Sequence, residues 1–146
     1  MAEDDKEDQE IFIEALDAAK IPSEVTTVGN GQELIDHLKD NTEPNPDIIF
    51  MDINMPGKGG KEALIEIKRD EELKEIPTVM LSTSDHPKDI KDTFDNGANL
   101  YVKKPNSFTS YIFLLKKVFS LFWTKAILNP VKNIFYLSER NISKEN

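Results

Sequence analysis

The apolar positions of this chain follow two different spacings in turn. Uninterrupted apolar residues at 48–51, and at 79–81 in the segment 78–81, indicate strands buried on both faces, because a half-exposed strand would alternate apolar and polar residues. Short segments at 25–28, rich in β-branched residues, and at 100–103 indicate two further strands, each followed by residues that favour turns.

Between the strands, apolar residues recur every three to four positions, as in helices that bury one face. Asp5 is a suitable N-cap for the first helix and Ser107 for the last. The predicted helices span residues 5–20, 32–39, 60–71, 85–97 and 107–123. Strands that alternate with helices over short loops predict βαβ units, and therefore a single α/β domain with a doubly wound parallel sheet.

Composition and charge narrow the classes of function. The 146 residues carry a net charge of -9, which argues against a nucleic-acid partner because phosphate binding needs a positive surface. The absence of cysteine excludes disulfides and thiolate chemistry, and two histidines argue against a zinc hydrolase. No signal peptide or apolar run of membrane-spanning length is present, so we expect a cytoplasmic protein with no membrane partner.

Reactive side chains fall where the predicted strands end. Asp52 follows one strand, Ser82 the next and Lys104 the last, while acids cluster at residues 3–10. In open α/β sheets, ligands bind at the carboxyl ends of the strands. Each residue alone also fits an ordinary role, as a loop cap, a turn former or a solvated lysine. Together they fit a site where carboxylates hold Mg2+, one carboxylate accepts a phosphoryl group, and the lysine and hydroxyl stabilise its charge.

The same positions carry a resemblance to a known family. The motifs are Glu-Asp-Asp at 3–5, Met-Asp-Ile-Asn-Met-Pro at 51–56, Leu-Ser-Thr-Ser at 81–84, Gly-Ala-Asn at 97–99 and Lys-Lys-Pro at 103–105. Over residues 3–124 the sequence resembles the receiver domains of two-component response regulators. The long loop before the central strand and the Phe-Trp ending are similar to small single-domain regulators paired with phytochrome-type histidine kinases.

The resemblance implies a role for each site residue. Asp52 is expected to be the phosphoacceptor, and the cofactor Mg2+ is expected on Glu3, Asp4, Asp52 and the backbone carbonyl of Asn54. Ser82 and Lys104 are expected to stabilise the phosphoryl group, and Tyr101 to act as the aromatic switch. Pro105 is expected to have a structural role through a cis bond to Lys104.

The resemblance also implies the partners. A histidine kinase or phosphotransfer protein would supply the phosphoryl group, and a downstream protein would read the change. The protein would assist its own phosphorylation and dephosphorylation without being a metabolic enzyme. The apolar last helix and tail favour a homodimer or a strand-swapped dimer. Two alternatives stay open: an interaction module with this fold that is not phosphorylated, and a flavin-binding flavodoxin. The lack of a hydroxyl-rich phosphate loop after a first strand disfavours the flavodoxin.

Two parts of the chain depart from the family pattern. The family has a flavodoxin-like sheet of strand order 2-1-3-4-5, and its first, central strand precedes the acidic pair, where this sequence begins with Met1-Ala2. After the receiver unit at 1–124, the tail at 125–146 contains a strand-like apolar segment at 131–139. We weigh two arrangements. Either this segment fills the central gap, in its own subunit or swapped into a neighbour, and brings Glu139 to the acidic site, or the tail packs outside the domain.

Overall fold

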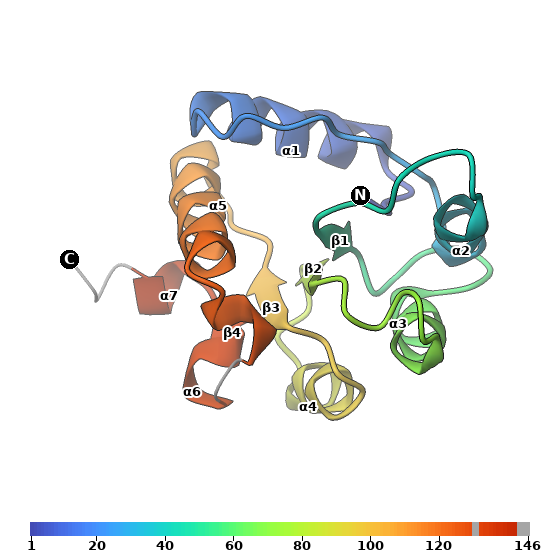
Figure 1. Ribbon diagram of the computed structural model, residues 1–146. Helices are drawn as coiled ribbons and strands as arrows, with labels where there is room; N and C mark the ends of the chain where they lie inside the picture. Colours follow the sequence, from blue (N-terminus) through green and yellow to red (C-terminus); the bar gives the residue numbers. More distant parts are fainter. Residues whose placement is uncertain (130–131, 143–146) are drawn as a thin grey trace.

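A computed structural model describes residues 1–129 and 132–142 of the chain. It contains a parallel sheet with helices on both faces (Figure 1), which confirms the predicted fold class. The main helices are α1 (Lys6–Ala18), α2 (Gly31–Lys39), α3 (Gly60–Arg69), α4 (Pro87–Asp95) and α5 (Phe108–Trp123). The strands are β1 (Ile49–Met51), β2 (Thr78–Ser82), β3 (Leu100–Lys103) and β4 (Tyr136–Leu137). The tail also forms η1 (Ala126–Leu128), α6 (Lys132–Phe135) and α7 (Glu139–Ile142).

Side-chain caps fix the starts of the first and last main helices. The Asp5 carboxylate accepts a hydrogen bond from the Asp8 N–H at 3.2 Å, and the Ser107 hydroxyl accepts one from the Ser110 N–H at 3.1 Å. Both predicted caps are therefore confirmed. The first cap sets the start of α1 directly after the acidic pair, so that Asp8 lies in the first helical turn.

The strands pair in the order β1-β2-β3-β4, and every pair is parallel. Met51 lies opposite Met80, and Ser82 lies opposite Lys103. This register aligns the carboxyl ends of β1, β2 and β3. Asp52, Ser82 and Lys104 consequently follow one another along a single edge of the sheet.

Alternate strand residues face two separate apolar layers. Met51 and Tyr101 pack with side chains of α2, α3 and α4, whereas Phe50 and Leu81 pack with side chains of α1 and α5. The strands are buried on both faces, as the uninterrupted apolar runs predict.

Residues 1–3 form a short remnant in the position of a central strand. Ala2 makes parallel bridges to Val28 on one side and Met51 on the other. The predicted strand at residues 25–28 is wrong: only Val28 pairs, because its one neighbour is this short remnant. On this side of the sheet, the family order 2-1-3 is represented by Val28, Ala2 and β1, in that sequence across the sheet.

The tail lies at the opposite edge of the sheet, beside β3 (Figure 1). There, β4 places Tyr136 opposite Tyr101 and Leu137 opposite Val102. The arrangement in which the tail fills the central gap is therefore wrong for this subunit, because the free edge of β3 pairs with the tail and Leu137 is buried there. Only two residues of the predicted strand at 131–139 form one, and Val131 lies outside the described residues.

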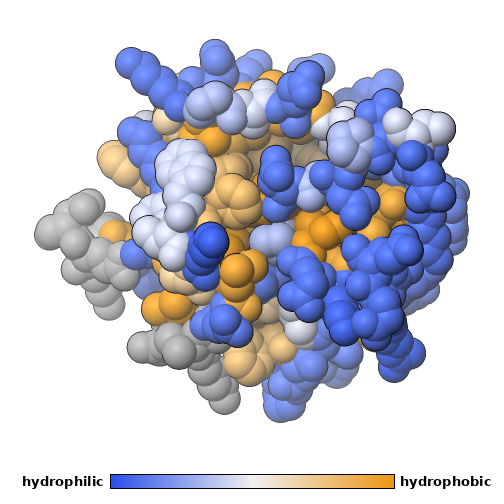
Figure 2. All heavy atoms as spheres, viewed as in Figure 1, coloured by the Kyte–Doolittle hydropathy of each residue, from blue (hydrophilic) through white to orange (hydrophobic). Residues whose placement is uncertain are grey.

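The face of the molecule in Figure 2 differs in polarity from one side to the other. Hydrophilic atoms predominate over α2, α3 and α4, around an apolar patch right of the centre, while apolar and weakly polar atoms gather around α5 and the tail. Phe108, Phe113 and Trp123 of α5 are exposed. Within the described ranges, no helix combines the length and the apolar character needed to cross a bilayer.

Candidate functional site

Three predicted site residues meet at the carboxyl edge of the sheet. Asp52 follows β1, Ser82 ends β2, and Lys104 follows β3. The Lys104 N–H donates to the Ser82 carbonyl at 2.8 Å, which anchors the start of the loop after β3. The Asp52 N–H donates to the Ala2 carbonyl at 3.0 Å, so the N-terminal remnant holds the other side of the site.

The Lys104 ammonium lies at the centre of the site. Its Nζ donates to Glu3 Oε1 at 2.5 Å and to Asp52 Oδ2 and Asp8 Oδ2, each at 3.0 Å. The Lys104 side chain is only 11% exposed. Burial disfavours its charged form, yet the hydrogen bonds to Glu3, Asp52 and Asp8 outweigh burial and raise the pKa of Lys104 above its usual range. The lysine is therefore a fixed positive charge.

Glu3 is the buried member of the acidic group. Its side chain is 1% exposed, and its N–H donates to the Val28 carbonyl at 2.9 Å. Burial raises the pKa of Glu3 to about 7, the Asp52 carboxylate adds to this effect, and the Lys104 ammonium opposes it. A carboxylate in this position is stabilised by any further positive charge that enters the site.

The acidic group fits a hard divalent cation. One oxygen each from Glu3, Asp4 and Asp52 can lie within 4.8 Å of the others. Mg2+ prefers oxygen ligands of this kind, so these three carboxylates are the residues that would hold it. Asn54 lies beside this group, because its N–H donates to Asp52 Oδ1 at 3.3 Å.

Ser82 and Tyr101 meet at the turn after β2. Both side chains are buried. The Ser82 hydroxyl accepts a hydrogen bond from the Ser84 N–H at 3.1 Å, and the Tyr101 hydroxyl donates to the Ser84 carbonyl at 2.7 Å. Tyr101 thus contacts the Ser82–Ser84 turn, and its hydroxyl donates to this turn and not to Asp52.

Two expectations around the site are wrong. The described residues contain no cis peptide bond, so the bond between Lys104 and Pro105 is trans. The trans form is favoured by about 0.5–1 kcal/mol for X–Pro bonds, and the Lys104 N–H bond to Ser82 already directs the lysine. Glu139 does not join the acidic group. Its carboxylate accepts a hydrogen bond from the Asn106 N–H, because the tail lies beside β3.

The structure adds two contacts that the sequence pattern did not single out. Asp8 is one of three acids that hold Lys104, and Ser84 is the acceptor for Tyr101. Asp8 lies three residues after the N-cap of α1, where an acid is usually explained by the helix dipole alone. The signal that could have indicated its contact with Lys104 is that the end of β3 and the start of α1 both lie at the acidic edge.

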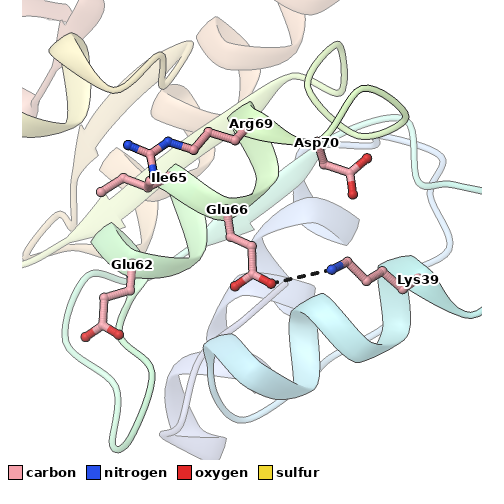
Figure 3. A pocket seen from close by; sticks show the side chains of 6 residues that line it. All are labelled: Lys39, Glu62, Ile65, Glu66, Arg69 and Asp70. Atoms are coloured by element: carbon pink, nitrogen blue, oxygen red, sulfur yellow. Dashed lines mark ion pairs between the residues drawn. The ribbon is translucent and has the colours of Figure 1, made fainter.

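Apart from the acidic edge, a hollow lies on the outer surface of α2 and α3 (Figure 3). Glu66 in this hollow is already paired with Lys39 at 3.5 Å and with Lys58 at 2.5 Å. Among the described residues, the acids grouped closely enough to hold a metal ion are Glu3, Asp4 and Asp52, and none of these lines the hollow. The acidic edge of the sheet is therefore the better candidate site.

The chain is similar in sequence and structure to known proteins. Residues 1–114 match the family model of the response regulator receiver domain. Response regulator Rcp1 of Synechocystis sp. is 30% identical over 134 residues, which cover 89% of this chain and 90% of Rcp1. The phosphorylated cyanobacterial phytochrome response regulator RcpA aligns with a TM-score of 0.77 at 35% identity, over 85% of this chain and 91% of RcpA. The Mn(2+)-bound form of Rcp1 aligns with a TM-score of 0.74 at 29% identity, over 90% and 94% of the two chains.

Proposed function

Because the chain belongs to the response regulator receiver family, we propose that it accepts a phosphoryl group on Asp52 in a two-component phosphorelay. The receiver unit covers residues 1–124, and residues 125–146 form a tail attached to it. In this role the protein is a signalling switch and not a metabolic enzyme. The signal passes to a downstream protein through a change of conformation.

The contact between Lys104 and Asp52 carries this proposal. The ammonium lies 3.0 Å from Asp52 Oδ2, at the edge of the sheet where the acids also gather. In the transfer, an Asp52 carboxylate oxygen forms a bond to phosphorus, and the bond from phosphorus to the donor histidine nitrogen breaks. The imidazole leaves with the electron pair and takes up a proton. Lys104 is positioned to stabilise the negative charge on the phosphoryl oxygens.

Glu3, Asp4 and Asp52, with the backbone carbonyl of Asn54, are the residues that would hold Mg2+. When bound, the ion supplies positive charge that is shared with the phosphoryl oxygens. The all-oxygen donor set supports this choice of metal. The Mn(2+)-bound form of the similar regulator Rcp1 is a further support.

The proposed phosphoryl donor is a histidine kinase or a phosphotransfer protein. The similarity to RcpA, which is described as a phytochrome response regulator, favours a kinase of the phytochrome type. The exposed start of α1 and the surface around α4 and β3 are the proposed contact regions.

Ser82 and Tyr101 are proposed to transmit the phosphorylated state. Both now bond to the same residue, Ser84, one through its N–H and the other through its carbonyl. If the phosphoryl group attracts the Ser82 hydroxyl, the Ser84 N–H loses its acceptor and the turn that holds Tyr101 is free to change. Such a change would repack the surface around α4 and β3.

A phosphorylation assay tests the function directly. The full chain is incubated with acetyl phosphate and Mg2+, and its intact mass is measured. We expect the wild type to gain one phosphoryl group and Asp52→Asn to gain none. Asp47→Asn is the matched control, because Asp47 is an exposed acid at the other end of the same apolar run and should leave phosphorylation unchanged. Chelation of Mg2+ should abolish the gain in the wild type.

Two outcomes would contradict the proposal. Phosphorylation of Asp52→Asn to the level of the wild type would place the phosphoryl group on another residue. No gain by the wild type in the presence of Mg2+ would instead favour an interaction module that has the receiver fold without its chemistry.

A further inference from the structure

An ion-pair network joins α3 to α4, and both helices cover the same face of the sheet (Figure 1). Lys61 Nζ of α3 lies 2.7 Å from Asp89 Oδ1 and 3.1 Å from Asp92 Oδ2 of α4. Asp92 has a second partner, because Lys88 Nζ lies 3.0 Å from the same oxygen. Lys61 and Asp89 are half-buried, so salt and water screen their attraction less than that of an exposed pair.

Asp89 also holds the turn that follows β2. Its Oδ2 accepts a hydrogen bond from the Ser84 hydroxyl at 2.6 Å, while its Oδ1 faces Lys61. The Lys61 ammonium, and after it the Ser84 hydroxyl, lowers the pKa of Asp89, so both contacts favour the charged carboxylate. Through its two oxygens, Asp89 therefore ties Ser84 to α3.

The polar groups of Ser84 are all hydrogen-bonded in this position. Its N–H donates to the Ser82 hydroxyl at 3.1 Å, and its carbonyl accepts from the Tyr101 hydroxyl at 2.7 Å. Its hydroxyl accepts from the His86 N–H at 3.2 Å, in addition to its bond to Asp89. Hydrogen bonds to a charged group are roughly twice as strong as those between neutral groups, so the bond to Asp89 is the strongest of the four.

The α3 end of the network lies against the backbone of Asp52. The Gly60 N–H donates to the Ile53 carbonyl at 2.9 Å, and a Cβ at Gly60 would collide with the Asp52 carbonyl oxygen. Gly60 is the first residue of α3, and Lys61 is the next. The network therefore fixes the Ser84 turn relative to the end of β1, where Asp52 lies.

We propose that Asp89, held by Lys61, is a positioning residue that keeps the Ser84 turn in its unphosphorylated place and so restrains Ser82 and Tyr101. The inference rests on the proposed phosphorylation of Asp52. In this place the Ser84 N–H holds the Ser82 hydroxyl, which must be released before it can reach the phosphoryl group. Since the ion pair stabilises this place of the turn, its loss makes the move easier and phosphorylation faster.

Four variants of the full chain and one control test the proposal. Lys61→Met removes the ion pair, whereas Lys61→Arg keeps a positive charge and hydrogen-bond donors. Ser84→Ala removes the hydroxyl that donates to Asp89, and a double variant combines Lys61→Met with Ser84→Ala. Lys91→Met is the matched control, because it breaks the exposed ion pair of Lys91 with Asp95 on α4. We measure the initial rate of phosphorylation by acetyl phosphate with Mg2+, and hydrogen exchange of the residue-84 amide without a phosphoryl donor.

We expect Lys61→Met to raise both the phosphorylation rate and the exchange rate by at least about threefold. Loss of a positive charge by itself would instead slow capture of the anionic donor. Lys61→Arg and Lys91→Met should keep the wild-type values. Ser84→Ala should also speed phosphorylation, and Lys61→Met should add nothing to it, because the connection to the turn is already broken.

If the wild type is phosphorylated, an unchanged rate in Lys61→Met would overturn the proposal. Equal increases in Lys61→Met and Lys91→Met would also overturn it, and so would additive effects in the double variant. Failure of the proposed function gives a different result, because the exchange measurement needs no phosphoryl group. With an unphosphorylated wild type, faster exchange in Lys61→Met would still support the anchoring of the turn, and unchanged exchange would overturn it.

Discussion

At the scale of single residues, Lys104 organises the acidic edge. It joins acids from three parts of the chain: Glu3 from the N-terminal remnant, Asp8 from α1, and Asp52 from the end of β1. Its raised pKa follows from these bonds, which prevail over burial. The proposed phosphoacceptor Asp52 and the proposed metal ligand Glu3 therefore stay together because one buried ammonium balances their negative charges.

Lys104→Met should lower the free energy of unfolding by about 3 kcal/mol in the absence of Mg2+, because it leaves Glu3 and Asp52 buried without their positive partner. Lys103→Met is the matched control. Lys103 pairs with Asp85 at the surface, so its loss should cost less than about 1 kcal/mol. Urea unfolding measures both values, and equal losses would show that Lys104 does not hold the acids together.

At the scale of elements, Asn99 links the start of β3 to β2, α3 and η1. It lies just before β3, and its Oδ1 accepts from the Thr78 N–H of β2 at 2.9 Å and from Lys68 Nζ of α3 at 3.1 Å. Its Nδ2 donates to the Ile127 carbonyl of η1 at 2.9 Å. These bonds hold the amino ends of β2 and β3 in register and attach the start of the tail to them.

Asn99→Ala should lower the free energy of unfolding by about 3 kcal/mol, because the Thr78 N–H and the Ile127 carbonyl lose their buried partner together. Asn96→Ala offers a control three residues earlier, since Asn96 makes an exposed bond to the Asp92 carbonyl and its loss should cost less than about 1 kcal/mol. Chemical denaturation distinguishes the two. A loss for Asn99→Ala as small as that of the control would mean that these elements are held by apolar packing alone.

At the scale of the whole molecule, the tail covers Tyr101, the proposed aromatic switch. Phe135 is 2% exposed, and its ring centroid lies 5.0 Å from that of Phe94 and 6.5 Å from that of Tyr101. Tyr136 lies 5.9 Å from Tyr101 on the same face. A rearrangement of Tyr101 must therefore either carry the tail with it or break these contacts.

The sequence predicts the sheet and its acidic edge, because both depend on local patterns. Apolar runs identify buried strands, and Asp52 and Lys104 follow directly from where the runs end. The strand at 25–28 is not predicted correctly, because β-branched residues favour a strand only when a neighbour pairs with them. The position of the tail is not predictable either. An apolar strand-like segment can pair with any open edge of a sheet, and its sequence does not distinguish the central gap from the edge of β3, where it pairs.

Phe135→Ala tests whether the tail is part of the folded molecule. It removes a buried ring between α4 and β3 and should lower the free energy of unfolding by about 3–4 kcal/mol. Phe113→Ala, on the exposed side of α5, should change it by less than about 0.5 kcal/mol, because its ring is 53% exposed. Deletion of residues 130–146 should destabilise at least as much as Phe135→Ala, since it also removes the β4 pairing. If Phe135→Ala and the deletion both matched Phe113→Ala in urea unfolding, the tail would not be packed on Tyr101, and the proposed switch surface around Tyr101 would not be covered by it.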